Sequence, residues 1–486
     1  MCPPDGPDAA GDDPGPFISV LSFVTDDMKT TLDALSKIVK PRNPMALSLR
    51  RSLDALASKL GYFQVMSIYG VERFTYLVVN FFVFPIVARA YGPEVLGRYA
   101  LAQTIVSLVT PFLAGGAEPI IIRDLVRRRE DRGPVAGSAV LLLGLFMVPA
   151  VLAPIVYASA AYSDDPVVVQ LVLCLAIGFV PTPIYVIDYL WRSELRPAFS
   201  VLPRLLIMPL ALAAKAAAAV SGLSIIAIGA ITAVEAWVSA GLVTIVYLVA
   251  RRPEERWGLD RASFRALFQQ AFPAMVSWLA GLIFYRITHL MLSWLSVYRE
   301  VGIYSVAFQL IQIPIILQTI VLSTCYPRLV ALKDEQPARY SEYLDKLLSF
   351  FSLAGWALVV VVFLFGDWGL TTVFGSDFAG SSPVLLLLSA SILANFSGAV
   401  RGQVIFIVNR PNLHVVNALV GLAVLVPADF ILIPLYGALG GAVAVAIASF
   451  ATSMLTSFLF AETSSVGRLQ FRRLFFPSLN FWKLPA

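Results

Sequence analysis

Long apolar runs alternate along the chain with short polar connections. A transmembrane helix needs about 20 apolar residues to cross a hydrocarbon core about 30 Å thick. Runs of this kind lie at about 64–90, 96–117, 135–160, 166–187, 199–221, 224–249, 272–297, 302–326, 347–366, 381–400, 413–435 and 438–461. The pattern predicts an all-α polytopic membrane protein with about 12 transmembrane helices.

Basic residues fall almost entirely into alternate connections. One side of the predicted membrane receives thirty Lys and Arg residues, counting both tails, and the other side keeps only Arg89, Arg98 and Arg299. Because cytoplasmic loops carry the excess of Lys and Arg, the segregation predicts that both termini face the cytoplasm. A missed or invented span would scramble this pattern, so it also supports the number of spans.

The composition excludes several classes of protein. A hydrophobic content of 58% with only 14% charged residues does not fit a soluble domain of this length. The net charge of +5 is spread among short loops, where orientation and anionic membrane lipids explain it better than nucleic acid does. The three cysteines show no paired spacing and the two histidines are far apart, so neither a metal site nor another cofactor is expected.

A short motif occurs twice at equivalent topological positions. The segment LGRYALA at 96–102 recurs as VGIYSVA at 301–307, an offset of 205 residues. Arg196-Pro197 before the fifth span likewise matches Arg410-Pro411 before the eleventh. Chance similarity among Gly-, Ala- and Leu-rich helices is the alternative. The ordered matches favour two six-helix bundles, and since six is even, a pseudo-two-fold axis along the membrane normal should relate them.

The repeat and the polar connections divide the chain into five parts. These are a partly disordered cytoplasmic N-terminal extension (1–61), an N-terminal six-helix bundle (62–250), a cytoplasmic interfacial linker helix (251–271), a C-terminal six-helix bundle (272–462) and a cytoplasmic tail (463–486). The linker is predicted to lie at the membrane surface because Phe264, Leu267 and Phe268 share one helical face, with Arg261 and Arg265 beside the headgroups.

Several segments resemble a known family over about residues 62–461. They are AYGPEVLGRYALAQTIVSL followed by GAEPIIIRDL (116–125), GIYSVA (302–307), VFGSDF (373–378) and ADFILIPLYGALGGAVAVAIASF (428–450). They are similar to polysaccharide flippases of the multidrug/oligosaccharidyl-lipid/polysaccharide exporter superfamily. The resemblance implies an inner-membrane protein that moves a polyprenyl-pyrophosphate-linked oligosaccharide to the outer leaflet by alternating access. Other polysaccharide-assembly proteins are conceivable partners.

Seven titratable residues fall inside the apolar runs. They are Glu72, Arg73, Lys215, Glu235, Arg286, His289 and Asp429. A charge at mid-bilayer costs roughly 2.5 to 3.5 kcal/mol on insertion scales, so each should face a polar cavity or a partner. Arg73, Lys215 and Arg286 are candidates to bind the pyrophosphate, because guanidinium and ammonium groups bind phosphate oxygens. The alternative for each is a structural ion pair between helices.

The remaining four residues are candidates for ion coupling or for charge balance. Glu72, Glu235 and Asp429 can neutralise the cations, and His289 lies one helical turn after Arg286. Relatives often carry an acidic residue in span seven where this chain has Thr288 and His289, so the coupling ion, H⁺ or Na⁺, stays open. No phosphate-cradling loop or catalytic constellation is found, which favours a transporter over an enzyme. An ion-coupled multidrug exporter and, less favoured, a membrane glycan polymerase or transferase are the alternatives.

Overall fold

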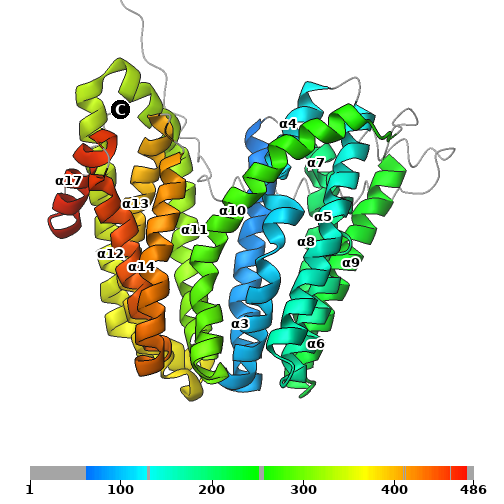
Figure 1. Cartoon of the computed structure of the whole chain (residues 1–486), viewed down its shortest axis with the longest axis horizontal. Coiled ribbons are helices and arrows are strands. Elements are labelled where there is room, and N and C mark those ends of the chain that lie inside the picture. Colours follow the sequence, from blue (N-terminus) through cyan, green and yellow to red (C-terminus); the bar gives the residue numbers. More distant parts are fainter. Residues whose placement is uncertain are drawn as a thin grey trace, which may run out of the picture.

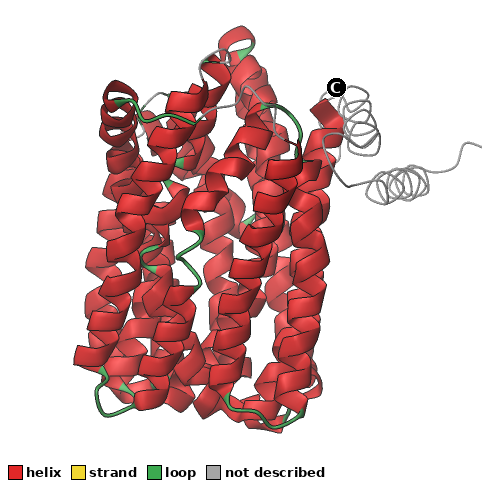
Figure 2. Cartoon of the chain, turned by 90° about the vertical axis from the view of Figure 1, so that its right-hand side faces the viewer, coloured by secondary structure: helices red, strands yellow, loops and turns green. Residues whose placement is uncertain are grey.

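The protein is all-helical throughout its described residues. The structure is a computed structural model that describes residues 62–128, 132–250, 257–408, 410, 412–459 and 461–478. Figure 2 shows the long helices running roughly parallel, with most loops at the two ends. The predicted all-α class is confirmed. The N-terminal extension, residues 1–61, lies outside the described residues, and its disorder stays a prediction.

Two sets of helices form the molecule (Figure 1). The N-half contains α3 (Tyr62–Ser107), η1 (Pro111–Gly115), α4 (Glu118–Arg127), α5 (Arg132–Ala161), α6 (Pro166–Ile177), η2 (Thr182–Tyr185), α7 (Val186–Ser193), α8 (Ala198–Val220) and α9 (Ile225–Ala250). The C-half contains α10 (Arg261–Leu295), α11 (Tyr298–Glu335), α12 (Pro337–Phe374), η3 (Ser376–Phe378), α13 (Ser381–Ile407), α14 (Asn412–Tyr436), α15 (Ala438–Phe450), η4 (Ala451–Leu455), α16 (Thr456–Phe458) and α17 (Ala461–Phe475).

The helices agree with the predicted number of membrane crossings. Eleven helical stretches in the described part of the chain are long and apolar enough to span a membrane. One of them, Phe81–Arg127, has 47 residues, which at about 1.5 Å per residue is twice the length that a crossing needs. It contains a kink at Gly92, where a φ of 72° interrupts the helix. Because α3 begins at Tyr62, about 30 residues precede Gly92, which is enough for one crossing, and the stretch to Arg127 supplies the next, as the predicted spans 64–90 and 96–117 require.

The predicted linker helix is not a separate element. Asp260 caps the N-terminus of α10 by accepting hydrogen bonds from the amides of Ala262 (3.2 Å) and Ser263 (2.9 Å), and the helix then continues unbroken to Leu295. Leu267 is buried in the core of the N-half rather than in lipid. Figure 1 shows α10 running diagonally from the N-half toward the C-half. The expectation of a surface helix was wrong because the same apolar face packs against protein.

The two halves meet in a contact that repeats itself by symmetry. A side chain added at Gly97 would collide with the carbonyl group of Tyr298, and one added at Gly302 would collide with the carbonyl group of Pro93. The offset of 205 converts each of these contacts into the other. An isologous contact of this kind is what a two-fold axis produces. We call this contact the glycine seam, and it supports the predicted pseudo-symmetry of the two bundles.

The ribbons of the halves diverge away from the glycine seam (Figure 1). At the diverging end α4 finishes at Arg127, α10 begins at Arg261 and α11 reaches Lys333 in its last turn. We call this end of the molecule the basic end. It is the end at which the sequence predicts the cytoplasm.

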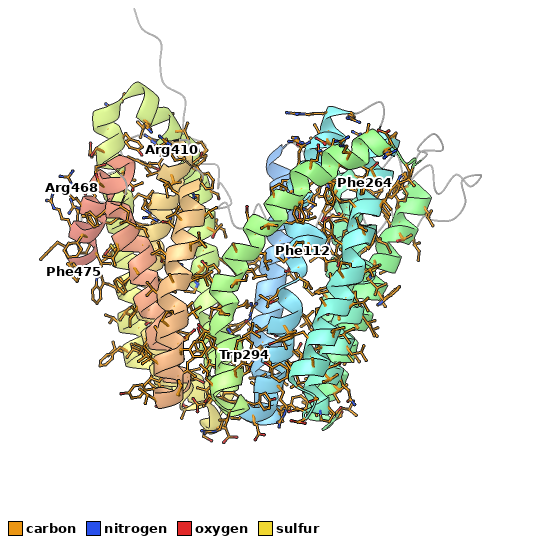
Figure 3. The ribbon with its side chains drawn as sticks, in the orientation of Figure 1. Phe112, Phe264, Trp294, Arg410, Arg468 and Phe475 are labelled. Carbon is orange, nitrogen blue, oxygen red and sulfur yellow. The ribbon has the colours of Figure 1, made fainter. Side chains whose placement is uncertain are left out.

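The predicted tail begins as a docked helix. The Arg473 guanidinium in α17 forms two hydrogen bonds with the Asp345 carboxylate in α12, at 2.6 and 2.5 Å, and the Trp356 indole donates to the Leu474 carbonyl at 2.7 Å. In Figure 3, Arg468 and Phe475 project from the outer edge of the C-half. The described part of 463–486 therefore belongs structurally to the C-half.

Candidate functional site

A buried polar contact joins α10 and α14 inside the C-half. The Thr288 hydroxyl donates a hydrogen bond of 2.9 Å to Oδ2 of Asp429, whose residue is fully buried. The other carboxylate oxygen, Oδ1, is also buried and has no hydrogen-bond partner. Asp429 forms no ion pair within the described residues. A carboxylate with one open oxygen in an apolar seam is able to take up a proton or a cation.

About one turn before His289, Arg286 carries a charge that no carboxylate neutralises among the described side chains. Its guanidinium lies 5.8 Å from the centre of the Phe308 ring, at the edge of the range for a cation–π contact. His289 is almost completely buried and meets the rings of Tyr304 and Phe308 edge to face, at 4.8 and 4.9 Å. Arg286 and His289 therefore lie together against α11, as their spacing predicts.

Lys215 and Glu235 neutralise one another. The Lys215 ammonium lies 2.7 Å from a Glu235 carboxylate oxygen, which joins α8 to α9 within the N-half. This arrangement matches the structural ion pair that the sequence left open as the alternative for Lys215. Because Glu235 neutralises Lys215, the electrostatic attraction of Lys215 for a bound anion is weaker than that of Arg286, which has no such partner among the described side chains.

Glu72 is also paired, but with a residue that the sequence analysis did not single out. Arg204 on α8 bonds Glu72 on α3 at 2.6 Å and lies 3.4 Å from Asp188 on α7. Asp188 in turn bonds Arg192 at 2.8 Å, and Arg192 reaches Glu118 on α4 at 2.5 Å. These five residues, which we call the N-half charge chain, connect α3, α8, α7 and α4.

The charge chain was missed because a helix break hides it in the sequence. The predicted fourth span, 166–187, ends one residue before Asp188, whereas the structure ends α6 at Ile177 and starts α7 at Val186. Pro181 and Pro183 lie in the break, since proline cannot donate a helical hydrogen bond. Arg204 had been counted with the cytoplasmic connections because it lies close to the start of its span.

Arg73 is the remaining candidate for phosphate binding. Arg73 lies on α3, but its side chain is outside the described residues, so its role stays a prediction. Within the described ranges, no group of three or more His, Cys, Asp or Glu side chains is arranged to hold a metal ion. Asp429 at the α10–α14 seam and Arg286 against α11 thus remain without an ion-pair partner among the described side chains.

Parallel apolar helices of membrane length, two bundles related by a seam and charges placed between helices define a multi-pass membrane protein. The family model described as "Polysaccharide biosynthesis protein" matches residues 86–383, more than half of the chain. The chain belongs to this family. A capsular polysaccharide biosynthesis protein, CapF of Staphylococcus aureus, is 25% identical over 190 residues. That match covers 39% of this chain and 48% of CapF, so it spans about half the length of the relative.

Solved structures show the same fold at low sequence identity. The lipid II flippase MurJ in an inward closed conformation superimposes with a TM-score of 0.67 at 12% identity, covering 86% of this chain and 94% of MurJ. An inward-facing multidrug resistance MATE transporter of the MOP superfamily gives a TM-score of 0.66 at 14% identity, covering 82% and 99%. The predicted resemblance to a polysaccharide-biosynthesis family is confirmed by the family match, and these two structures confirm the fold. At these identities the two structures establish the fold, and they do not choose between a lipid and a drug as substrate.

Proposed function

We propose that the chain is a flippase that moves a polyprenyl-pyrophosphate-linked oligosaccharide from the cytoplasmic to the outer leaflet by alternating access, for cell-surface polysaccharide biosynthesis. In this proposal it lies in the inner membrane with both termini in the cytoplasm. The basic end is then the cytoplasmic end, in agreement with the distribution of Lys and Arg. The family to which the chain belongs supports a role in polysaccharide biosynthesis.

The observation that carries the proposal is the uncompensated charge of Arg286. Arg286 is partly buried, and a cation shielded from water is stabilised when an anion or a set of hydrogen bonds replaces the lost water. Lys215 has Glu235 for this purpose, and Arg286 has no carboxylate in the described part of the chain. The planar guanidinium donates two parallel hydrogen bonds to phosphate oxygens, so a pyrophosphate is a ligand of suitable charge and shape.

Asp429 is the candidate for ion coupling in the same proposal. Its open Oδ1 accepts either a proton or part of a Na⁺ coordination shell, and its hydrogen bond from Thr288 ties it to α10, the helix that carries Arg286. Occupation of Asp429 would thereby alter the packing of α10 against α14. Glu72 and Glu235 act as charge-balancing residues, because each already holds a cation. His289 fills the aromatic contact with Tyr304 and Phe308.

Reconstituted vesicles test the proposal directly. Purified full-length protein is placed in vesicles with a fluorescent polyprenyl-pyrophosphate-linked oligosaccharide, and its appearance in the opposite leaflet is followed with a membrane-impermeant glycosidase. Loss of one hydrogen-bonded charge contact is worth about 1.5 to 3 kcal/mol, so Arg286→Gln should slow transfer by roughly 10- to 100-fold. Arg265→Gln removes an exposed charge from the same helix and should leave the rate unchanged.

Two results would count against the proposal. Full transfer by a normally folded Arg286→Gln variant would remove Arg286 from the mechanism. Proton- or sodium-driven uptake of a cationic dye by the same vesicles, without any transfer of the lipid-linked oligosaccharide, would establish the multidrug exporter in place of the flippase.

A further inference from the structure

A buried cation lies at the basic end of the C-half. Arg401 is on α13, six residues before that helix ends at Ile407, and its residue is only 3% exposed. Nine residues later, Arg410 lies at the basic end of the same half (Figure 3). At about 1.5 Å per residue, Arg401 lies about 9 Å from the end of its helix.

The hydrogen-bond partners of the Arg401 guanidinium among the described residues are neutral hydroxyl groups. Nη1 of Arg401 donates to the hydroxyl oxygens of Thr456 at 2.5 Å and Ser457 at 3.1 Å, at the end of the last span. Thr456 donates its own hydroxyl hydrogen to the Thr452 carbonyl group. Ser457 is within donating distance of the Gln470 amide oxygen at 2.6 Å. The hydroxyl groups are therefore acceptors for Arg401, and they supply no negative charge.

The other edge of the guanidinium is open. Nε of Arg401 is buried without an acceptor, and Nη2 makes no hydrogen bond with the described residues. Among the side chains that the structure describes, no carboxylate lies within ion-pair distance of Arg401. His414, on the first turn of α14, lies within electrostatic range of Arg401, and its buried Nε2 also lacks a partner. Because His414 also hydrogen-bonds the Gly402 backbone, its Nε2 donates to an anion only when the imidazole is protonated, and the part of this site that lacks acceptors is the Nε–Nη2 edge of Arg401.

The free-energy cost of burying the unpaired Arg401 charge indicates that an anion binds there. An unpaired buried charge destabilises a protein by several kcal/mol, and buried Arg residues are normally paired with an anion. The open Nε–Nη2 edge presents two parallel N–H groups, the geometry that binds two oxygens of one phosphate group. A single-atom anion would use only part of this edge. A tetrahedral oxyanion satisfies both the charge and the two donors.

We propose that Arg401, with Thr456, Ser457 and His414 around it, forms a second anion site that binds a phosphate oxyanion at the basic end of the C-half. The phosphodiester of an anionic phospholipid and free inorganic phosphate share this chemistry. Gln470 of α17 covers the site, since it bonds Ser457 and also donates to the Ser397 carbonyl at 3.0 Å. The bound anion thereby stabilises the docking of α17. This site is independent of the transport function proposed above.

The experiment compares the melting of purified full-length protein in phosphate-free neutral detergent after addition of phosphatidylglycerol, phosphatidylcholine or inorganic phosphate. Phosphatidylglycerol or phosphate should raise the melting temperature of the unmodified protein, and phosphatidylcholine should not. The Arg401→Gln variant should bind the stabilising ligand at least about tenfold more weakly. The matched control is Arg468→Gln, which removes an exposed charge from α17 and should respond like the unmodified protein.

The ligand that stabilises the protein identifies the source of the bound phosphate group. A response to phosphatidylglycerol alone assigns the site to lipid headgroups, and a response to inorganic phosphate alone assigns it to free phosphate. An equal response of Arg401→Gln and the unmodified protein to every ligand overturns the proposal, as does an equal loss in Arg468→Gln. If Arg401→Gln does not fold, the double variant Thr456→Val, Ser457→Ala keeps the charge and disturbs only the cradle. An unchanged ligand response in that variant also overturns the site.

Discussion

The N-half and the C-half share a helical plan and differ in how they hold buried charge. In the N-half, the charge chain and the Lys215–Glu235 pair give every one of these seven residues an oppositely charged neighbour on another helix or one turn away. In the C-half, Arg286, Arg401 and Asp429 have none among the described residues. The N-half thus pairs these seven described charges, whereas these three groups of the C-half have no ion-pair partner even though Arg473 and Asp345 of the same half are paired.

The difference separates two uses of charge in a membrane. A paired charge holds helices in a fixed relation, because removing either partner leaves the other uncompensated in a medium of low dielectric constant. An unpaired charge does not fix the relation between helices, and it costs free energy because it is shielded from water. A bound ligand of opposite charge offsets this free-energy cost. The N-half therefore has the properties of a scaffold. Under the two proposals above, the C-half is the half that binds anions.

The strongest test of this comparison removes one cation from each half. Arg204→Ala leaves Glu72 and Asp188 without their shared partner, so it should lower the free energy of unfolding by about 3 kcal/mol. Arg286→Ala removes a charge that has no partner and should change stability by less than about 1 kcal/mol. Denaturant unfolding in detergent micelles measures both. Similar losses for the two variants would contradict the division between the halves.

The glycine seam is the place where the halves should behave alike. Gly302→Ala forces a methyl group against the Pro93 carbonyl, and Gly97→Ala forces one against that of Tyr298. Overpacking of this kind costs about 1 to 3 kcal/mol, and symmetry requires nearly equal losses in thermal unfolding. Gly281→Ala on α10 is the control, because no atom lies near its added methyl group. A large loss in only one seam variant would show that the contact is not symmetric in energy.

The sequence predicted those parts of the fold that depend on apolar runs of membrane length or on the internal repeat. Apolar runs of membrane length predicted the crossings, and the repeated Gly97 and Gly302 motif predicted the relation between the halves, because both depend on local sequence and on symmetry. The linker helix was wrong for a physical reason. Lipid and a protein core are both apolar, so the face that contains Leu267 satisfies either environment, and only the tertiary structure places it against the N-half.

The site was predictable in its residue types and not in its pairings. Charges inside apolar runs were easy to find, and Arg286 was selected on this basis. Which charges meet depends on helix rotation and on breaks such as the one before Asp188, and neither is encoded in hydropathy. Arg401 escaped because it lies one residue beyond the predicted tenth span, 381–400, where Arg is ordinarily a headgroup anchor.

The Lys215–Glu235 pair tests whether the paired charges of the N-half are structural, with a smaller expected loss of stability. Lys215→Met and Glu235→Gln should each destabilise the protein, and the double variant should lose less than the sum of the two. We expect a coupling free energy of about 1 to 2 kcal/mol from a double-mutant cycle of unfolding. Transport by the folded variants should match that of the unmodified protein. Loss of transport in Lys215→Met with unchanged stability would instead make Lys215 part of the substrate site.

The smallest expected effect concerns the first turn of α10, which lies on the N-half. Hydrogen bonds from the Ser263 hydroxyl and from the amides of Ser263 and Ala262 hold the pKa of Asp260 below its ordinary value of 3.8. Since the folded state favours the ionised carboxylate, its contribution to stability is complete above about pH 3.8 and disappears as the pH falls through the lower folded pKa.

Asp260→Asn should therefore weaken the cap at neutral pH and remove this part of the acid dependence. Faster hydrogen exchange of the amides of Ala262 and Ser263 measures the weaker cap. Arg286 lies about seven turns farther along α10, at 3.6 residues per turn, so oligosaccharide transfer should stay unchanged. Impaired transfer in this variant would mean that the N-terminal turn of α10 is coupled to the charges of the C-half, and the two halves could then no longer be treated as separate scaffold and binding units.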